Sequence, residues 1–147
     1  AIHKRCCCPP DKPRALFFKR SLSSSQIAAC FSDRSTISSN FDLENRHYGV
    51  DIAANPNESV LATLDGTVIL STYTAETGYV IQIQHGQDFV SVYKHCGSLL
   101  KKEGDPVKGG EAIALVGNTG EKTTGPHLHF ELWHKGRAID PSKYIVF

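Results

Sequence analysis

Two alternating segments joined by a polar turn decide the fold of this chain: Tyr79-Val-Ile-Gln-Ile-Gln84, His85-Gly-Gln-Asp88 and Phe89-Val-Ser-Val-Tyr-Lys-His95. Apolar and polar side chains alternate in the first and third segments, which is the pattern of a β-strand with one buried face. The glycine-containing segment between them is typical of a turn. In the second strand, the alternation predicts one shared face for Phe89, Ser91, Tyr93 and His95.

Further short strands are expected on both sides of this pair. They cover residues 59–64, 67–70, 111–116 and 126–133. Asp65-Gly66 is a hairpin-type dipeptide between the first two of these strands. A helix is expected only as a short turn near residues 98–102. Many short strands with glycine-rich turns predict an all-β fold, with antiparallel sheets in a sandwich or barrel-sandwich-hybrid arrangement.

Length and charge restrict the classes of protein to consider. The chain has 147 residues, 40% of them hydrophobic, which suits one domain with a substantial core. Residues 1–40 hold seven Lys and Arg against two acids, a net charge of +5, whereas residues 41–147 hold nine against thirteen, a net charge of −4. A mildly acidic domain argues against nucleic-acid binding. No apolar run approaches the ~20 residues of a transmembrane helix.

The N-terminal region differs from the rest of the chain. Residues 1–38 lack a strand or helix period and are predicted to be a poorly ordered extension, before a domain that covers residues 39–147. Ile27-Ala-Ala-Cys30 has the form of a lipoprotein cleavage box, but residues 21–26 before it are too polar for the apolar part of an export signal. A chance match is therefore favoured, and lipid attachment at Cys30 is the alternative.

Cysteine spacing predicts neither a disulfide framework nor a structural zinc site. The five cysteines are Cys6, Cys7, Cys8, Cys30 and Cys96. Their number is odd, and no two of them form a C-x-x-C pair. Only Cys96 lies within residues 41–147, so this region must fold without an internal disulfide.

Four histidines and one aspartate carry the predicted chemistry: His47, Asp51, His95, His127 and His129. A catalytic zinc ion takes three protein ligands, commonly two histidines and a carboxylate, and keeps one position for water. This set meets that demand and leaves two histidines to move protons or to stabilise an oxyanion. One such histidine alone is usually a surface or core residue, and the joint occurrence of all four raises the odds that they have a functional role. His3, His85 and His134 have no partner motif.

Three motifs have the spacing of a known family. They are His47-Tyr-Gly-Val-Asp51, Tyr93-Lys-His95 and His127-Leu-His129-Phe-Glu131. Glycine-bearing segments such as Val116-Gly-Asn-Thr-Gly120 also match. With these motifs, residues 41–147, about seven-tenths of the chain, resemble the lysostaphin/LytM-type zinc metallopeptidases, which cleave peptide cross-bridges in bacterial peptidoglycan.

The resemblance implies a role for each matching position. His47, Asp51 and His129 would bind Zn²⁺, and His95 and His127 would be the catalytic histidines. Glu131 is expected either beside the metal ligands or in a cross-strand pair with Lys or Arg. Tyr93 would contact substrate or pack in the core, and packing is favoured. The loops at residues 72–78 and 117–125 would flank the cleft.

The family also implies a setting for the protein. Its substrate lies in the cell envelope, so the chain is expected in the periplasm or outside the cell, as a monomer that binds peptidoglycan peptide. One alternative is a catalytically silent domain of the same type that regulates other cell-wall hydrolases. The other is a lipoyl- or biotinyl-type carrier, suggested by residues 104–114. It is disfavoured because no lysine occupies a hairpin tip between apolar neighbours and the chain has no methionine.

Overall fold

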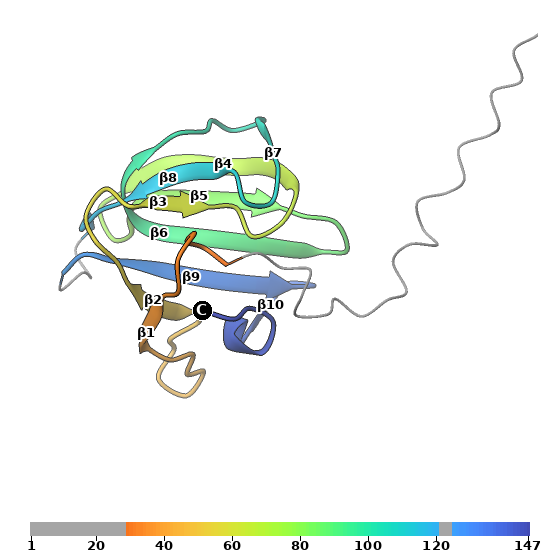
Figure 1. Cartoon of the computed structure of the whole chain (residues 1–147). Coiled ribbons are helices and arrows are strands. Elements are labelled where there is room, and N and C mark those ends of the chain that lie inside the picture. Colours follow the sequence, from red (N-terminus) through yellow and green to blue (C-terminus); the bar gives the residue numbers. More distant parts are fainter. Residues whose placement is uncertain (1–28, 121–124) are drawn as a thin grey trace, which may run out of the picture.

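The computed structural model describes residues 29–120 and 125–147, and this part of the chain is built from β-strands (Figure 1). The strands are β1 Thr36–Ser39, β2 Val50–Ala53, β3 Ser59–Leu61, β4 Gly66–Thr74, β5 Gly78–Gln84, β6 Phe89–Leu99, β7 Pro106–Val107, β8 Ala112–Val116, β9 His127–His134 and β10 Arg137–Ile139. A 3-10 turn, η2 at Pro141–Lys143, follows β10. All named strand pairs are antiparallel, so the predicted all-β, antiparallel fold class is confirmed.

The sheet is organised around β6, its longest strand. The main strand order is β1-β2-β9-β6-β5-β4-β7, and β8 pairs with both β3 and the second half of β6. One face of the central strands is apolar, because alternate residues point the same way. It contributes Ile81, Ile83, Tyr93, Phe130 and Leu132 to a core that β3 and β8 complete. The opposite face of β6 and β9 remains for the predicted site.

The alternation of β6 breaks just before His95. Along β5, Ile81 pairs with Tyr93 while Tyr79 pairs with Cys96, so two residues of β6, Lys94 and His95, lie opposite one of β5. This is a β-bulge, and His95 takes the left-handed backbone conformation, with φ at 63°. The extra residue turns His95 away from the core face that holds Tyr93. The prediction that these two residues share one face was therefore wrong.

Two other local predictions were wrong. Asp65-Gly66 is not a hairpin turn, because β3 pairs with β8 while β4 pairs with β5 and β7. Glycine is needed at position 66 because a Cβ there would collide with the backbone oxygen of Gln84. No helical turn forms near residues 98–102, since β6 continues to Leu99 and pairs there with β8.

The fold begins before the predicted boundary at residue 39. Cys30 and Phe31 are buried in the core, the carbonyl of Cys30 accepts a hydrogen bond from the amide of Leu61, and β1 pairs with β2. Because the Cys30 thiol is fully buried, it could carry a lipid only by leaving the core, which disfavours lipid attachment at this residue. Cys30 and Cys96 are both free thiols. The predicted disorder of residues 1–28 lies outside the described residues.

His85, which has no motif partner in the sequence, belongs to a buried hydrogen-bond network. Its Nδ1 lies 2.9 Å from the carbonyl oxygen of Asp65, and its Nε2 lies 2.7 Å from Oγ of Ser91. A carbonyl only accepts hydrogen bonds, so Nδ1 carries the proton and Nε2 accepts from the serine. Burial outweighs the carbonyl contact and lowers the pKa of His85. The ring is therefore held neutral in the folded chain.

This network predicts a loss of stability in mild acid. The unfolded chain protonates His85 near its ordinary pKa of 6.5, whereas the folded chain takes up the proton at lower pH. The stabilisation is therefore fully present above pH 6.5 and is lost as the pH falls through the folded pKa. In thermal melts of metal-free protein, prepared with a chelator, His85→Gln should lower the melting temperature at pH 7.5. The melting temperature of this variant should also fall less than that of the wild type between pH 7.5 and pH 5.5. Equal pH slopes in the variant and the wild type would contradict this account.

Candidate metal centre

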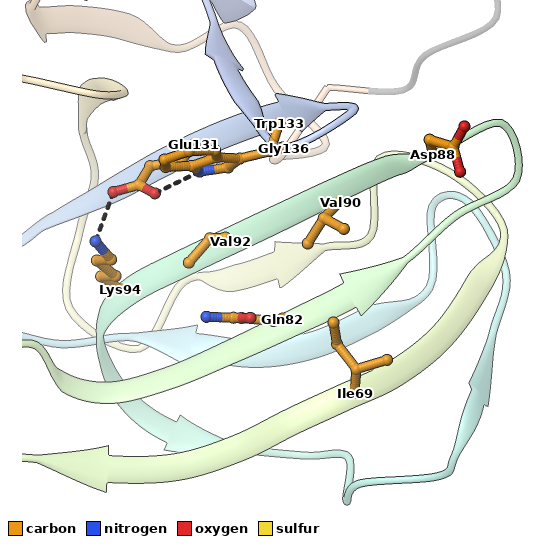
Figure 2. A pocket seen from close by; sticks show the side chains of 9 residues that line it. All are labelled: Ile69, Gln82, Asp88, Val90, Val92, Lys94, Glu131, Trp133 and Gly136. Carbon is orange, nitrogen blue, oxygen red and sulfur yellow. Dashed lines mark hydrogen bonds and ion pairs between the residues drawn. The ribbon is translucent and has the colours of Figure 1, made fainter.

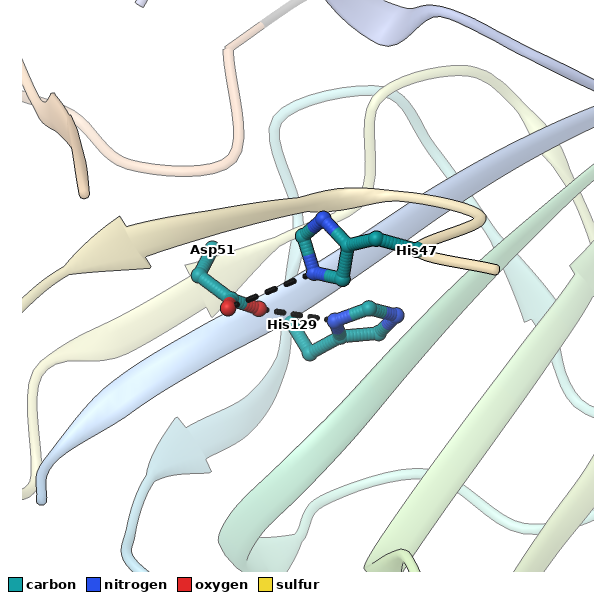
Figure 3. Close-up of side chains that lie close together, drawn as sticks. All are labelled: His47, Asp51 and His129. Carbon is teal, nitrogen blue, oxygen red and sulfur yellow. Dashed lines mark hydrogen bonds and ion pairs between the residues drawn. The ribbon is translucent and has the colours of Figure 1, made fainter. Parts of the chain in front are cut away.

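Strand pairing brings together the three residues that the resemblance assigns to the metal. Asp51 on β2 lies directly opposite His129 on β9, so their side chains share one face. His47 lies just before β2, which begins at Val50, and its side chain points towards Asp51 and His129 (Figure 3). One potential ligand atom from each of the three residues lies within 4.8 Å of the others. Gly49 permits this approach, because a Cβ there would collide with the backbone oxygen of Phe130.

His47 presents an unsatisfied nitrogen to this cluster. Its Nδ1 lies 2.6 Å from the carbonyl oxygen of Asn40 and must donate to it. Nε2 is buried and has no hydrogen-bond partner among residues 29–120 and 125–147, although Oδ2 of Asp51 lies 3.3 Å away. A buried lone pair without a partner is costly in water-excluded surroundings. A cation held between His47 and Asp51 would satisfy it, so the residues present fit a metal ion.

His129 lies between two carboxylates. Its Nδ1 is 2.7 Å from Oδ1 of Asp51, and its Nε2 is 2.9 Å from Oε1 of Glu131. Burial lowers the pKa of His129, but the hydrogen bonds to the two carboxylates more than offset it and the net pKa is raised. Burial likewise raises the pKa of Asp51, and the His129 contact outweighs it to give a lowered pKa. Without a metal, His129 is therefore favoured in its charged form, with Asp51 as its anion.

Glu131 both contacts His129 and forms a cross-strand ion pair, so both expected environments occur. Nζ of Lys94 lies 2.5 Å from Oε1, and the indole nitrogen of Trp133 donates to Oε2 over 2.7 Å. Burial raises the pKa of Glu131, but the hydrogen bonds from His129 and Lys94 dominate and lower its pKa to about 2. The carboxylate is ionised at neutral pH and is held by three donors. Because Glu131 bonds Nε2 of His129, the Nδ1 side of the ring faces Asp51.

This arrangement predicts that Glu131 supports metal affinity without touching the metal. Glu131→Gln should weaken zinc binding by roughly 10- to 100-fold, because partners that orient a ligating histidine have effects of this size. Competition with a chromophoric chelator measures the change. Glu111→Gln is the matched control, since Glu111 forms an ion pair with Lys101 outside the cluster. Equal zinc affinities for the two variants would refute the orienting role.

His95 and His127 lie beside this cluster, and each ring is held through its Nδ1 by a backbone carbonyl. Nδ1 of His127 is 2.7 Å from the carbonyl oxygen of Gly125, and Nδ1 of His95 is 2.9 Å from that of Thr119. Both Nδ1 atoms must donate, because a carbonyl oxygen only accepts, so the neutral form of each ring carries its lone pair on Nε2. The two rings are 5.1 Å apart, and the His95 ring is 6.1 Å from that of His129. Burial lowers the pKa of His95, which favours its neutral form.

Tyr93 lies on the opposite side of β6 from the cluster. It is fully buried, packs against Phe130 with ring centroids 5.2 Å apart, and its hydroxyl contacts the amide and Oγ1 of Thr63. The structure thus places Tyr93 in the core. Lys94, one residue further on, pairs with His129 and points to the cluster side.

An open pocket of about 440 Å³ lies over β9, β6, β5 and β4, next to the cluster (Figure 2). Lys94 and Glu131 form the end nearest His129, and Val90, Val92 and Trp133 supply apolar surface along the strands. The pocket reaches Asp88 in the turn before β6. Glu131 links the pocket to the cluster, because its carboxylate also bonds His129.

Sequence reasoning missed the residues that hold the histidines in place. Asn40 and Thr119 act through backbone carbonyls, which any residue type supplies, so side-chain patterns give no signal for them. Lys94 gave only a weak signal, because the sequence alone does not show how β6 and β9 are aligned and so does not show that Lys94 lies near Glu131. A correct β6–β9 pairing would have revealed this pair.

The comparisons with known proteins agree with this geometry. Residues 45–141 match the model described as Peptidase family M23. The chain is 38% identical over 104 residues to murein hydrolase activator NlpD of Escherichia coli, covering 69% of this chain and 27% of that protein. It is 37% identical over 116 residues to peptidoglycan DD-endopeptidase ShyA of Vibrio cholerae, covering 73% of this chain and 27% of that protein. The chain thus spans about a quarter of these relatives.

A solved structure supports the same relationship. A zinc-containing peptidase from Vibrio cholerae superposes with a TM-score of 0.64 at 30% sequence identity, over 82% of this chain and 39% of that one. The family match, over residues 45–141, spans His47, Asp51 and His129.

Proposed function

Since this chain belongs to peptidase family M23, we propose that it is a zinc-dependent endopeptidase that hydrolyses peptide cross-links of bacterial peptidoglycan. The observation that carries the proposal is the buried Nε2 of His47, which has no hydrogen-bond partner among the described residues and faces Asp51 and His129, with His95 and His127 beside them. The similarity to a peptidoglycan endopeptidase supports the substrate class.

In this proposal the zinc ligands are Nε2 of His47, the carboxylate of Asp51 and Nδ1 of His129. When bound there, zinc supplies a Lewis acid that polarises a carbonyl and lowers the pKa of a water molecule. The second nitrogen of each ligating histidine already has an acceptor, the Asn40 carbonyl for His47 and Glu131 for His129. These contacts fix both ring orientations before a metal arrives.

The chain's own part in the reaction falls to His95 and His127. Each ring is held by its Nδ1–H, so its Nε2 can accept a proton from an attacking water molecule and later donate it to the leaving amine. The lowered pKa of His95 keeps it ready to accept at neutral pH. No glutamate follows either zinc-ligating histidine in an H-E-x-x-H motif, so proton transfer by such a glutamate is not available.

Regulation of other hydrolases is the second candidate function. It is favoured by the similarity to a murein hydrolase activator. All five histidine and aspartate positions are present in this chain and assemble at one place, which favours the enzyme. A peptidoglycan digest with this chain alone, a second wall hydrolase alone, and both together separates the two. Solubilisation by the mixture only would support the regulator.

The same substrate implies a location in the cell envelope, in the periplasm or outside the cell. Similarity to NlpD proteins, one of them named a lipoprotein, supports this location. Within the described residues, no helix has the length and apolar character to span a bilayer. We propose peptidoglycan peptide as the partner and a monomer as the working form, which light scattering of the purified chain would test.

A further inference from the structure

Thr119 lies beside the bulge of β6, in the segment that leads from β8 towards β9. Its side chain and its carbonyl both contact the strands that place His95. The family motifs assign no role to this hydroxyl.

The hydroxyl of Thr119 bridges the backbones of β5 and β6 next to the bulge. Tyr79 on β5 and Cys96 on β6 are register partners next to the extra residue. Oγ1 of Thr119 accepts a hydrogen bond from the amide of Tyr79 over 3.0 Å and donates one to the carbonyl of Cys96 over 2.6 Å. The side chain thus bridges a donor and an acceptor that would otherwise bond each other or water.

The carbonyl of the same residue holds the imidazole of His95. Nδ1 of His95 donates to it over 2.9 Å, and the backbone amide of His95 donates to the carbonyl of Thr77 over 3.0 Å. His95 is therefore fixed at both its backbone and its ring. Because one residue closes the bulge and bonds the ring, moving Thr119 would disturb both.

Close packing leaves Thr119 little freedom to move. Gly78 has φ at +66°, and a Cβ at this position would collide with Oγ1 and the backbone of Thr119. A Cβ on Gly120 would collide with the backbone of Gly78. The two glycines let the loop backbone lie directly against the start of β5.

We propose that Thr119 is a positioning residue for His95: its hydroxyl stabilises the bulge that turns His95 towards the metal centre, and its carbonyl selects the tautomer with a free Nε2. The proposal rests on the proposed function only in taking His95 as a participant in hydrolysis. Its structural part concerns the free protein and holds whether or not zinc is bound.

Thr119→Val tests this role because it keeps the shape of the side chain and removes the hydroxyl. In chelated protein, side-chain ¹⁵N spectra of His95 should change from one tautomer, protonated at Nδ1, to a mixture. The Tyr79 amide should exchange faster with solvent. In the zinc-loaded protein, kcat on peptidoglycan peptide should fall by roughly 10- to 100-fold, as small misplacements of a reacting group cause. Zinc affinity and KM should not change.

Two further variants separate positioning from general destabilisation. Thr119→Ser keeps the hydroxyl and should restore the single tautomer of His95. Ser142→Ala removes a hydroxyl that donates to the carboxylate of Asp140 beside η2, and it should leave both tautomer and turnover as in the wild type. If Thr119→Val does not fold, Thr119→Ala is measured in its place against Thr119→Ser.

A wild-type tautomer and kcat in Thr119→Val would overturn the proposal. So would equal losses in Thr119→Ser and Thr119→Val, because the hydroxyl would then not be the cause. If the wild type itself hydrolyses no peptidoglycan, the proposed function fails instead, and the His95 spectrum of the chelated variants alone decides whether Thr119 positions the ring.

Discussion

His129→Ala is expected to bind zinc more than ~100-fold more weakly than the wild type, because losing a ligand costs more than the roughly 10- to 100-fold effect of losing an outer partner. His129 lies opposite Asp51 on the paired strand, and its Nδ1 is the atom that the geometry offers to the metal. Competition with a chelator gives the affinity, and hydrolysis of peptidoglycan should disappear with the bound zinc.

His134→Ala is the matched control for this variant. His134 ends the same strand but stacks on Phe89, with ring centroids 4.2 Å apart, outside the metal cluster. It should keep the zinc affinity and the turnover of the wild type. If His129→Ala retained zinc as tightly as His134→Ala, the ligand assignment would be wrong and the pairing of Asp51 with His129 would be only an ion pair.

His95→Ala is expected to retain zinc and lose most of its turnover. The ring contacts no proposed ligand by a hydrogen bond, so zinc content should stay at the wild-type level. General acid–base groups contribute typically ~10²- to 10⁴-fold, and kcat should fall within that range. Steady-state hydrolysis of a cross-linked peptide, with metal analysis of the same sample, measures both quantities. Full turnover in this variant would remove His95 from the mechanism.

The face of β9 could be predicted from the sequence because it obeys simple alternation. His127, His129, Glu131 and Trp133 share one side, and their neighbours fill the core. The partner strand β2 follows the same rule, which places Asp51 against His129. Two regular strands and a family motif were enough to predict that the three proposed ligands lie together.

The placement of His95 could not be predicted in this way. A bulge adds one residue and reverses the face of every residue after it, and nothing in Phe89 to His95 marks where the extra residue falls. Gly66 misled for a related reason, since a glycine needed for close strand contact looks the same in sequence as a glycine needed for a turn. Cys30 shows that a short apolar segment in a polar region can still enter the core.

Hydrolysis of purified peptidoglycan by the zinc-loaded chain tests the proposed function most directly. The chain should bind about one zinc ion, release soluble peptides that carry new amino and carboxyl ends, stop after chelation and resume when zinc is restored. A chain that holds its zinc ion yet leaves the cross-links intact under the same conditions would contradict the assignment as an endopeptidase.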